Sequence, residues 1–158
     1  MTSLASQPGW RKFGLICLCL AVGGISGWVT RPEIVSWYST LQKPTFNPPN
    51  WVFGPVWTLI YTLLGITAAN VWEMQIQGSY PRLPRLLFFV LLGINSLWSA
   101  LFFGLHRPDL AFIDIIAYIV VLGQWMRLIG PAARLQIPHL LWVLFATVLN
   151  FSIWWLNR

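Results

Sequence analysis

Three apolar segments of the chain carry rows of side chains that could line a site for a flat aromatic molecule. The rows, spaced by three or four residues, are Trp57, Tyr61 and Gly65; Asn95 and Trp98; and Trp142, Ala146 and Asn150. Residues at this spacing share one face of an α-helix. An aromatic core of a helix bundle is the alternative interpretation. We favour a ligand site because an amide within lipid needs a polar partner and often marks a pathway or site.

The segment before the first row adds further flat π surfaces. It begins at Trp37 and Tyr38, continues through the cation Lys43, and contains four prolines before Trp57. A proline-rich loop loses little conformational entropy when it becomes ordered. The loop can therefore hold aromatic rings and one positive charge beside the helical rows.

The composition identifies the solvent in which these segments must fold. The chain has 158 residues, of which 57% are hydrophobic and 9% are charged, with 4 acids and 10 bases. Soluble domains carry about 25% charged residues. The chain is too apolar to be disordered, and too poor in acids and histidines for a metal-rich hydrolase. The composition predicts a protein of the lipid bilayer.

Five segments with at most one ionisable group are long enough to cross a bilayer, which requires about 20 mostly apolar residues. Because unpaired backbone groups are costly in hydrocarbon, these segments are expected to be helical. The alternating polarity of a β-barrel is not seen. The prediction is an all-α integral membrane protein with a five-transmembrane-helix bundle, forming one domain over 1–158. The expected helices are 13–30, 51–73, 86–105, 110–129 and 138–156.

The bases indicate an orientation. With five spans, one side of the membrane would collect Arg11, Lys12, Arg82, Arg85, Arg127 and Arg134, and the other Arg31, Lys43, Arg107 and Arg158. Six against four favours a cytoplasmic N-terminus, because cytoplasmic loops carry the excess of Lys and Arg. The formal charge of +6 suits anionic lipid headgroups. The bases are dispersed, so no nucleic-acid partner is expected.

Other groups within the spans could mediate contacts. Ser96, Ala100 and Gly104 form a stripe of small residues that lets helices approach closely, either in a homodimer or within the chain. Asp114 is the only acid inside a span, and we expect it to face protein as a hydrogen-bonded or paired group, with a proton relay as the alternative. Cys17 and Cys19 point to different faces and are interpreted as small packing residues rather than a disulfide.

Motifs along most of the chain match one known family in order, over residues 13–157. They are Trp37-Tyr38, Leu41 and Lys43-Pro44; Pro48-Pro49, Trp51, Phe53, Pro55-Val56-Trp57-Thr58 and Tyr61; Asn95, Trp98-Ser99, Leu101-Phe102-Phe103-Gly104 and Asp114; and Pro138, Leu140, Trp142-Val143, Phe145-Ala146, Leu149-Asn150 and Trp154. On these residues the chain resembles the tryptophan-rich sensory protein family, also called the translocator protein or peripheral-type benzodiazepine receptor family, in its bacterial form.

The resemblance implies a five-helix bundle, usually dimeric, in a bacterial membrane. Its ligand cavity would be closed by the loop after the first helix, here 31–50. Family ligands are tetrapyrroles such as protoporphyrin IX and haem, cholesterol-like sterols and benzodiazepine-site compounds. Carried over by position, the pocket would use Trp37, Tyr38, Trp57, Tyr61, Asn95, Trp98, Trp142, Ala146 and Asn150. The light-dependent degradation of protoporphyrin by some bacterial members would map to Trp57 and Trp142.

Two departures from the family bear on the ligand. Phe151 and Trp155 stand where the sterol-recognition pattern of animal members needs a tyrosine and a basic residue, and such patterns are weak even when complete. His139 stands where the family typically has tyrosine. It is interpreted as an interfacial polar residue, with a haem ligand as the alternative.

A porphyrin needs aromatic walls and a cation near an open end for its propionates. The walls would be Trp37, Tyr38, Trp57, Trp98 and Trp142, and the cation Lys43 or Arg31. Tetrapyrrole binding and sensing, with regulation of tetrapyrrole metabolism or stress response implied by the family, is the first hypothesis. No cofactor is required and no metal site is expected.

Light-dependent porphyrin degradation is the enzymatic alternative, because photo-oxidation needs only an excited porphyrin beside an oxidisable indole. No nucleophile–base pair or phosphate loop supports other chemistry. Transport of tetrapyrroles or sterols is the third possibility. A single intramembrane acid and the lack of an inverted repeat count against it.

Overall fold

The computed structural model describes residues 9–78 and 81–158, and these residues form helices and connecting turns with no strand among them. In these two ranges five α-helices follow one another: α1 (Gly9–Val35), α2 (Phe53–Ile76), α3 (Leu83–Ser99), α4 (Pro108–Ile129) and α5 (Ile137–Leu156). Short 3-10 helices lie at η1 (Tyr38–Thr40), η2 (Asn50–Val52) and η4 (Gly130–Gln136). A π-helical turn, η3 (Ala100–Gly104), extends α3. The all-α class is as predicted.

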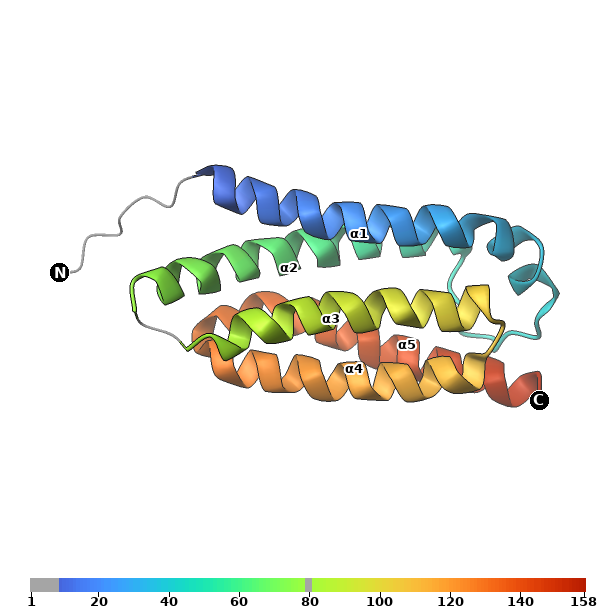
Figure 1. The fold of residues 1–158 in the computed structure, drawn as a ribbon. Coiled ribbons are helices and arrows are strands. Elements are labelled where there is room, and N and C mark those ends of the chain that lie inside the picture. The colour runs from blue at the N-terminus through green and yellow to red at the C-terminus, as the bar shows by residue number, and fades with distance from the viewer. Residues whose placement is uncertain (1–8, 79–80) are drawn as a thin grey trace.

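Within the described residues, four helical stretches are long and apolar enough to cross a membrane. Three contain α1, α2 and α3. The fourth runs without interruption for 49 residues from Pro108 to Leu156, because η4 joins α4 to α5. Figure 1 shows α4 and α5 lying side by side after the chain reverses at η4. The membrane character of the fold therefore agrees with the sequence.

The first helix is longer at both ends than the predicted 13–30. It includes Arg11 and Lys12 in its first turns and Arg31 near its last. Long cationic side chains can lie along apolar surface and keep their charge in a polar region. Pro32 also lies inside α1, less than one helical turn before the helix ends at Val35. The predicted loop 31–50 therefore begins later, after Val35.

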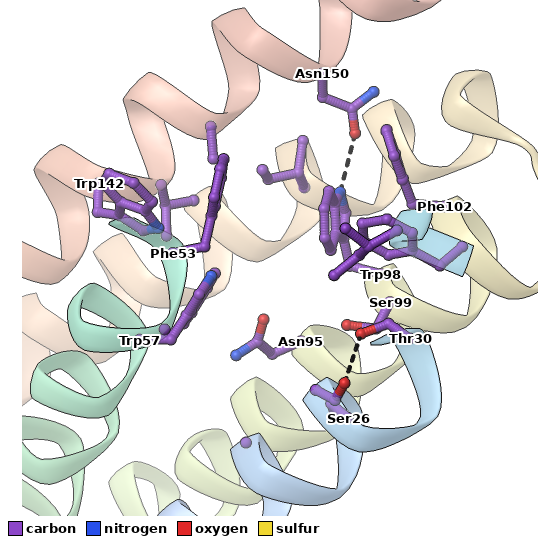
Figure 2. A pocket seen from close by; sticks show the side chains of 18 of the residues that line it. Ser26, Thr30, Phe53, Trp57, Asn95, Trp98, Ser99, Phe102, Trp142 and Asn150 are labelled. Carbon is purple, nitrogen blue, oxygen red and sulfur yellow. Dashed lines mark hydrogen bonds between the residues drawn. The ribbon is translucent and has the colours of Figure 1, made fainter. Parts of the chain in front are cut away.

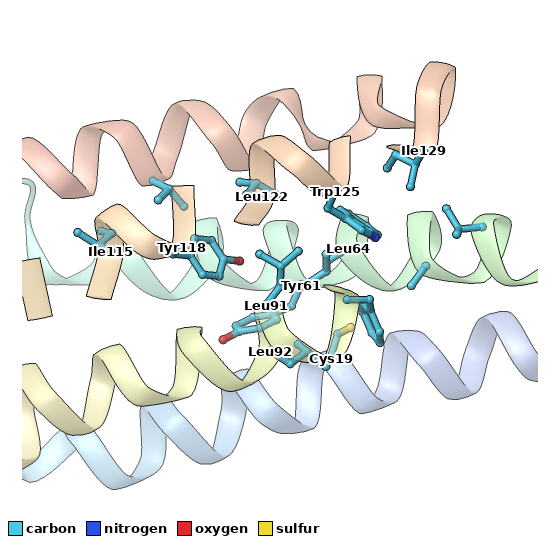
Figure 3. Packing of buried hydrophobic residues seen from close by; sticks show 14 residues of the cluster. Cys19, Tyr61, Leu64, Leu91, Leu92, Ile115, Tyr118, Leu122, Trp125 and Ile129 are labelled. Carbon is cyan, nitrogen blue, oxygen red and sulfur yellow. The ribbon is translucent and has the colours of Figure 1, made fainter. Parts of the chain in front are cut away.

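One half of the bundle is solid. Side chains from all five α-helices form a buried cluster there, which Figure 3 shows around Tyr61, Leu91, Leu122 and Trp125. Trp125 is fully buried, and its indole N–H donates to the carbonyl oxygen of Pro84 at 2.8 Å. The only polar atom of this tryptophan therefore has a partner. The other residues of the cluster are mostly aliphatic. This half contains the N-terminal part of α1.

Helices α1 and α2 touch through glycines. A methyl group at Gly65 would lie 2.6 Å from the Cα atom of Ile16, and one at Gly23 would lie 2.3 Å from the ring of Tyr61. Cys19 is buried between these contacts, whereas Cys17 is exposed, and both thiols are free. Cys17 therefore does not pack against other helices of the single chain, and the packing role predicted for it is wrong.

Gly65→Ala should destabilise the bundle, because the added methyl group meets backbone atoms that have no room to rotate away. Overpacking of this kind costs about 1–3 kcal/mol, so we expect a lower thermal unfolding temperature in detergent. Gly123→Ala is the matched control, because a methyl group there meets nothing within 4 Å. It should be neutral or stabilising by up to about 1 kcal/mol, from helix propensity. Equal unfolding temperatures for the two variants would show that the α1–α2 contact is not close in the folded protein.

Candidate ligand-binding cavity

The other half of the bundle contains a cavity of about 500 Å³. Residues from all five α-helices line it, from Leu20 to Ile34 on α1 and from Trp142 to Ile153 on α5. Small-molecule sites usually have volumes of roughly 300–1,000 Å³. The cavity is therefore large enough for an aromatic ligand of substantial size.

Aromatic rings form two opposing walls. Figure 2 shows Phe53, Trp57 and Trp142 on one side of the open space, with Trp98 and Phe102 on the other. The rings of Phe53 and Trp142 meet edge to face, with centroids 5.8 Å apart. Those of Trp98 and Phe102 are stacked at 5.0 Å. Ring pairs at these separations stabilise one another by about 0.5–1.5 kcal/mol beyond area burial, which favours preformed walls.

The structure brings together eight of the ten predicted site residues. The lining includes Tyr38, Trp57, Tyr61, Asn95, Trp98, Trp142, Ala146 and Asn150. Trp37 and Lys43 do not line the cavity. The ring of Trp37 stacks on His106 at 4.3 Å and packs edge-on against Phe102, so it supports a wall from behind.

Lys43 is held away from the cavity within its own loop. Its ammonium donates to the carbonyl oxygen of Leu41 at 3.1 Å and lies 4.7 Å from the centre of the Tyr38 ring. Arg31, the other cation considered for a propionate, lines the cavity and is exposed at its outer end. Arg31 makes no ion pair with any residue in the described ranges. It is therefore available to an anionic group of a ligand.

The loop after α1 is fastened at two places. The Tyr38 hydroxyl donates to Asn47 Oδ1 at 2.8 Å, and burial raises the pKa of Tyr38 although this bond partly opposes the shift. The backbone N–H of Gln42 donates to Asn157 Oδ1, and Asn157 Nδ2 donates back to the Gln42 carbonyl, both at 2.9 Å. This second pair joins the loop to the end of α5. The loop is consequently in place to cover the end of the bundle.

The two predicted amides serve as ties between helices. Asn95 Nδ2 donates to the Tyr61 hydroxyl at 2.8 Å, joining α3 to α2. Asn150 Oδ1 accepts the Trp98 indole N–H at 2.9 Å, and its Nδ2 donates to the carbonyl oxygen of Pro108 at 2.8 Å. Asn150 thus links α5 to both α3 and α4. These bonds hold Tyr61 and Trp98 in their positions on the cavity walls.

Asp114 differs from its prediction. It lines the cavity and is only 9% exposed, yet its carboxylate makes no hydrogen bond or ion pair with any described residue. The expectation of a hydrogen-bonded or paired acid is therefore wrong. The indole N–H of Trp142 is the second buried polar group here without a partner. Each faces a space that a ligand could occupy.

His139 is not an interfacial residue, because its side chain is fully buried. Gln136 Nε2 donates to Thr67 Oγ1 at 2.8 Å, which leaves Gln136 Oε1 to accept the Nδ1–H of His139 at 3.0 Å. His139 Nε2 then accepts the Tyr118 hydroxyl at 2.9 Å. Both ring nitrogens are engaged, so the alternative of a haem ligand would require this chain of bonds to break.

Several lining residues were not predicted. On α1 they are Gly23, Gly27 and Thr30, and on α2 Phe53. The α1 residues are four and three positions apart, so the same helical spacing that revealed the aromatic rows was available for them. Small residues leave room for a ligand but suggest no chemistry of their own. The residue types on α1 therefore did not indicate that this helix forms a wall of the site.

Tyr118→Phe should lower the free energy of unfolding by about 1–3 kcal/mol, because it leaves His139 Nε2 buried without a donor. Thermal unfolding in detergent measures the loss. A double variant with His139→Leu supplies the control: if the bond exists, the two losses should not add, since neighbouring partners are energetically coupled. Additive losses would contradict the hydrogen bond.

Comparison with known proteins shows the family of the chain. Residues 15–156 match the sequence model of the TspO/MBR family. A tryptophan-rich protein TspO of Archaeoglobus fulgidus is 40% identical over 145 residues, which cover 90% of this chain and 94% of the relative. The human translocator protein is 34% identical over 128 residues, covering 77% and 75%, and a tryptophan-rich sensory protein of Cereibacter sphaeroides is 33% identical over 152 residues, covering 94% and 92%. The predicted resemblance is confirmed, and the chain belongs to the TspO/MBR family of membrane proteins.

Proposed function

We propose that this protein is a membrane receptor that binds tetrapyrroles, such as protoporphyrin IX or haem, in the aromatic cavity. One observation carries the proposal: tryptophans from three different helices, Trp57, Trp98 and Trp142, line a single cavity of about 500 Å³. A flat macrocycle can stack on such rings. Regulation of tetrapyrrole metabolism or of a stress response would follow from occupancy of the cavity.

The electrostatics of the cavity suit a ligand with carboxylates at one edge. Arg31 lies at the outer end, where an anionic group can stay hydrated while the macrocycle enters the apolar interior. An arginine can form two parallel hydrogen bonds with a carboxylate. Of the two cations that the sequence offered for a propionate, Arg31 and Lys43, Arg31 is therefore the one we propose.

We propose in addition that α1 to α5 each cross the membrane once, with α4 and α5 as separate spans around η4. The N-terminus would lie in the cytoplasm, according to the distribution of bases. The stripe of Ser96, Ala100 and Gly104 would form a homodimer contact. Support comes from its exposure, since Ala100 and Gly104 are exposed on the single chain and Ser96 is partly exposed.

Arg31→Gln should weaken protoporphyrin binding several-fold, because it removes the cation at the cavity mouth. Lys43→Gln should have little effect, since the Lys43 ammonium is bound to its own loop. Quenching of tryptophan fluorescence by protoporphyrin measures both. The dimethyl ester of protoporphyrin lacks the carboxylates and should bind both variants like the unaltered protein. Weaker binding of the ester to Arg31→Gln would show that Arg31 acts through packing and not through its charge.

The double variant Trp57→Phe, Trp142→Phe should weaken protoporphyrin binding in darkness, because phenylalanine offers a smaller stacking surface and no indole N–H. Trp10→Phe is the control, since Trp10 is 70% exposed on the surface of α1. Absorbance titration avoids the loss of fluorophores. Unchanged affinity in the double variant would remove these residues from the binding site.

The light-dependent alternative has one observation in its favour, because Trp57 and Trp142, which match the two tryptophans of porphyrin-degrading bacterial members, both line the cavity. Illumination of the protein–porphyrin complex should then reduce the porphyrin absorption band faster than illumination of free porphyrin. The double variant should lose this difference even at concentrations that saturate it. Equal bleaching of bound and free porphyrin would leave the protein as a receptor only.

A further inference from the structure

The cavity contains a buried acid that neither the helix packing nor tetrapyrrole binding uses. Asp114 lies six residues into α4, which corresponds to a depth of about 9 Å at 1.5 Å per residue. Its Oδ2 atom is shielded from solvent and has no hydrogen-bond donor among the described residues. An isolated carboxylate in apolar surroundings is costly, because it loses its hydration without gaining a partner. A ligand that supplies a partner recovers that cost.

Several polar groups that line the cavity are committed elsewhere. Tyr118, one turn further along α4, donates its hydroxyl to His139. Asn95 donates to Tyr61, and Asn150 donates to Pro108. Arg31, the only arginine or lysine in the cavity lining, forms no ion pair with Asp114. The indole N–H of Trp142 also lacks a partner but carries no charge, so none of the described lining residues neutralises this acid.

The walls around the acid favour a positively charged partner over a neutral donor. Trp57, Trp98 and Trp142 line the same cavity, and the face of an indole ring attracts a cation, more strongly when water is excluded. A neutral N–H group would satisfy one oxygen of Asp114 but would leave its negative charge uncompensated. An ammonium group satisfies the oxygen, balances the charge and gains the attraction of the rings. An aromatic or aliphatic body attached to the ammonium would fill the rest of the cavity.

We propose that Asp114 is a recognition site for protonated amines, so that the cavity also accepts amphiphilic organic cations. The inference rests on the proposed function in one respect, because it takes the cavity to be a ligand site. It adds a second class of ligand, oriented by the buried acid and not by Arg31. Such a ligand and a tetrapyrrole would compete for the same space.

Two probes with the same flat ring test the charge. At neutral pH 1-pyrenemethylamine carries an ammonium group, whereas 1-pyrenemethanol carries a neutral hydroxyl. Both are titrated against the protein in nanodiscs of phosphatidylcholine, with empty nanodiscs to correct for partition into lipid. Quenching of tryptophan fluorescence reports binding. We expect the amine to bind about ten- to a hundredfold more tightly than the alcohol, which is the range of a hydrogen bond to a charged group.

Asp114→Asn keeps the shape of the side chain and removes its charge. It should abolish the preference for the amine while leaving the affinity for the alcohol unchanged. Asp109→Asn is the matched control, because Asp109 lies on the same helix but pairs with Arg107 at 2.6 Å outside the cavity lining. It should keep the preference. The thermal unfolding temperature of Asp114→Asn should not fall, since an unpaired buried charge is removed.

The outcomes separate this inference from the proposed function. Equal binding of amine and alcohol by the unaltered protein, or a preference that survives in Asp114→Asn, would overturn the amine site. A parallel titration with protoporphyrin tests tetrapyrrole binding by itself. Protoporphyrin binding without an amine preference would reject only the amine site. An amine preference that depends on Asp114, without protoporphyrin binding, would reject the tetrapyrrole receptor and keep the amine site.

Discussion

The close contact between α1 and α2 determines where the bundle is solid and where it is hollow. Lipid is as apolar as a leucine side chain, so helices in a membrane associate through close packing and polar bonds. At Gly65 the two backbones touch, and at Gly23 the ring of Tyr61 fills the space that a side chain would take. At Gly27, one turn further along α1, nothing lies within 4 Å of an added methyl group. Gly27 and Thr30 line the cavity there, so this part of α1 leaves space that a ligand could occupy.

Around the cavity, hydrogen bonds between side chains hold the helices together. Asn95 joins α3 to α2, Asn150 joins α5 to α3 and α4, and His139 joins α5 to α4. Three of these four bonds fix an aromatic side chain that lines the cavity: Tyr61, Trp98 or Tyr118. The walls therefore keep their positions although few atoms pack between them. The same polar residues that define the site also hold its helices together.

This double role explains what the sequence could predict. The aromatic rows were found because residues on one helix face recur at fixed spacing, and Trp57, Trp98 and Trp142 all line the cavity. The partners of polar side chains depend on neighbouring helices, which spacing along one helix does not reveal. For that reason His139 was placed at an interface and Asp114 was expected to be paired. The choice between Arg31 and Lys43 depended on the path of a loop, in which Lys43 turns back onto the carbonyl oxygen of Leu41.

The division into two halves also explains how the protein keeps a cavity in a stable fold. Close-packed side chains around Leu91, Leu122 and Trp125 anchor the five helices to one another, so the part of the bundle around the cavity can tolerate missing contacts. Functional sites commonly retain groups that would be more stable if they were packed or paired. Asp114 and the indole N–H of Trp142 are such groups. A bundle in which α1 closed onto these side chains would be more stable, but it would leave no space for a ligand.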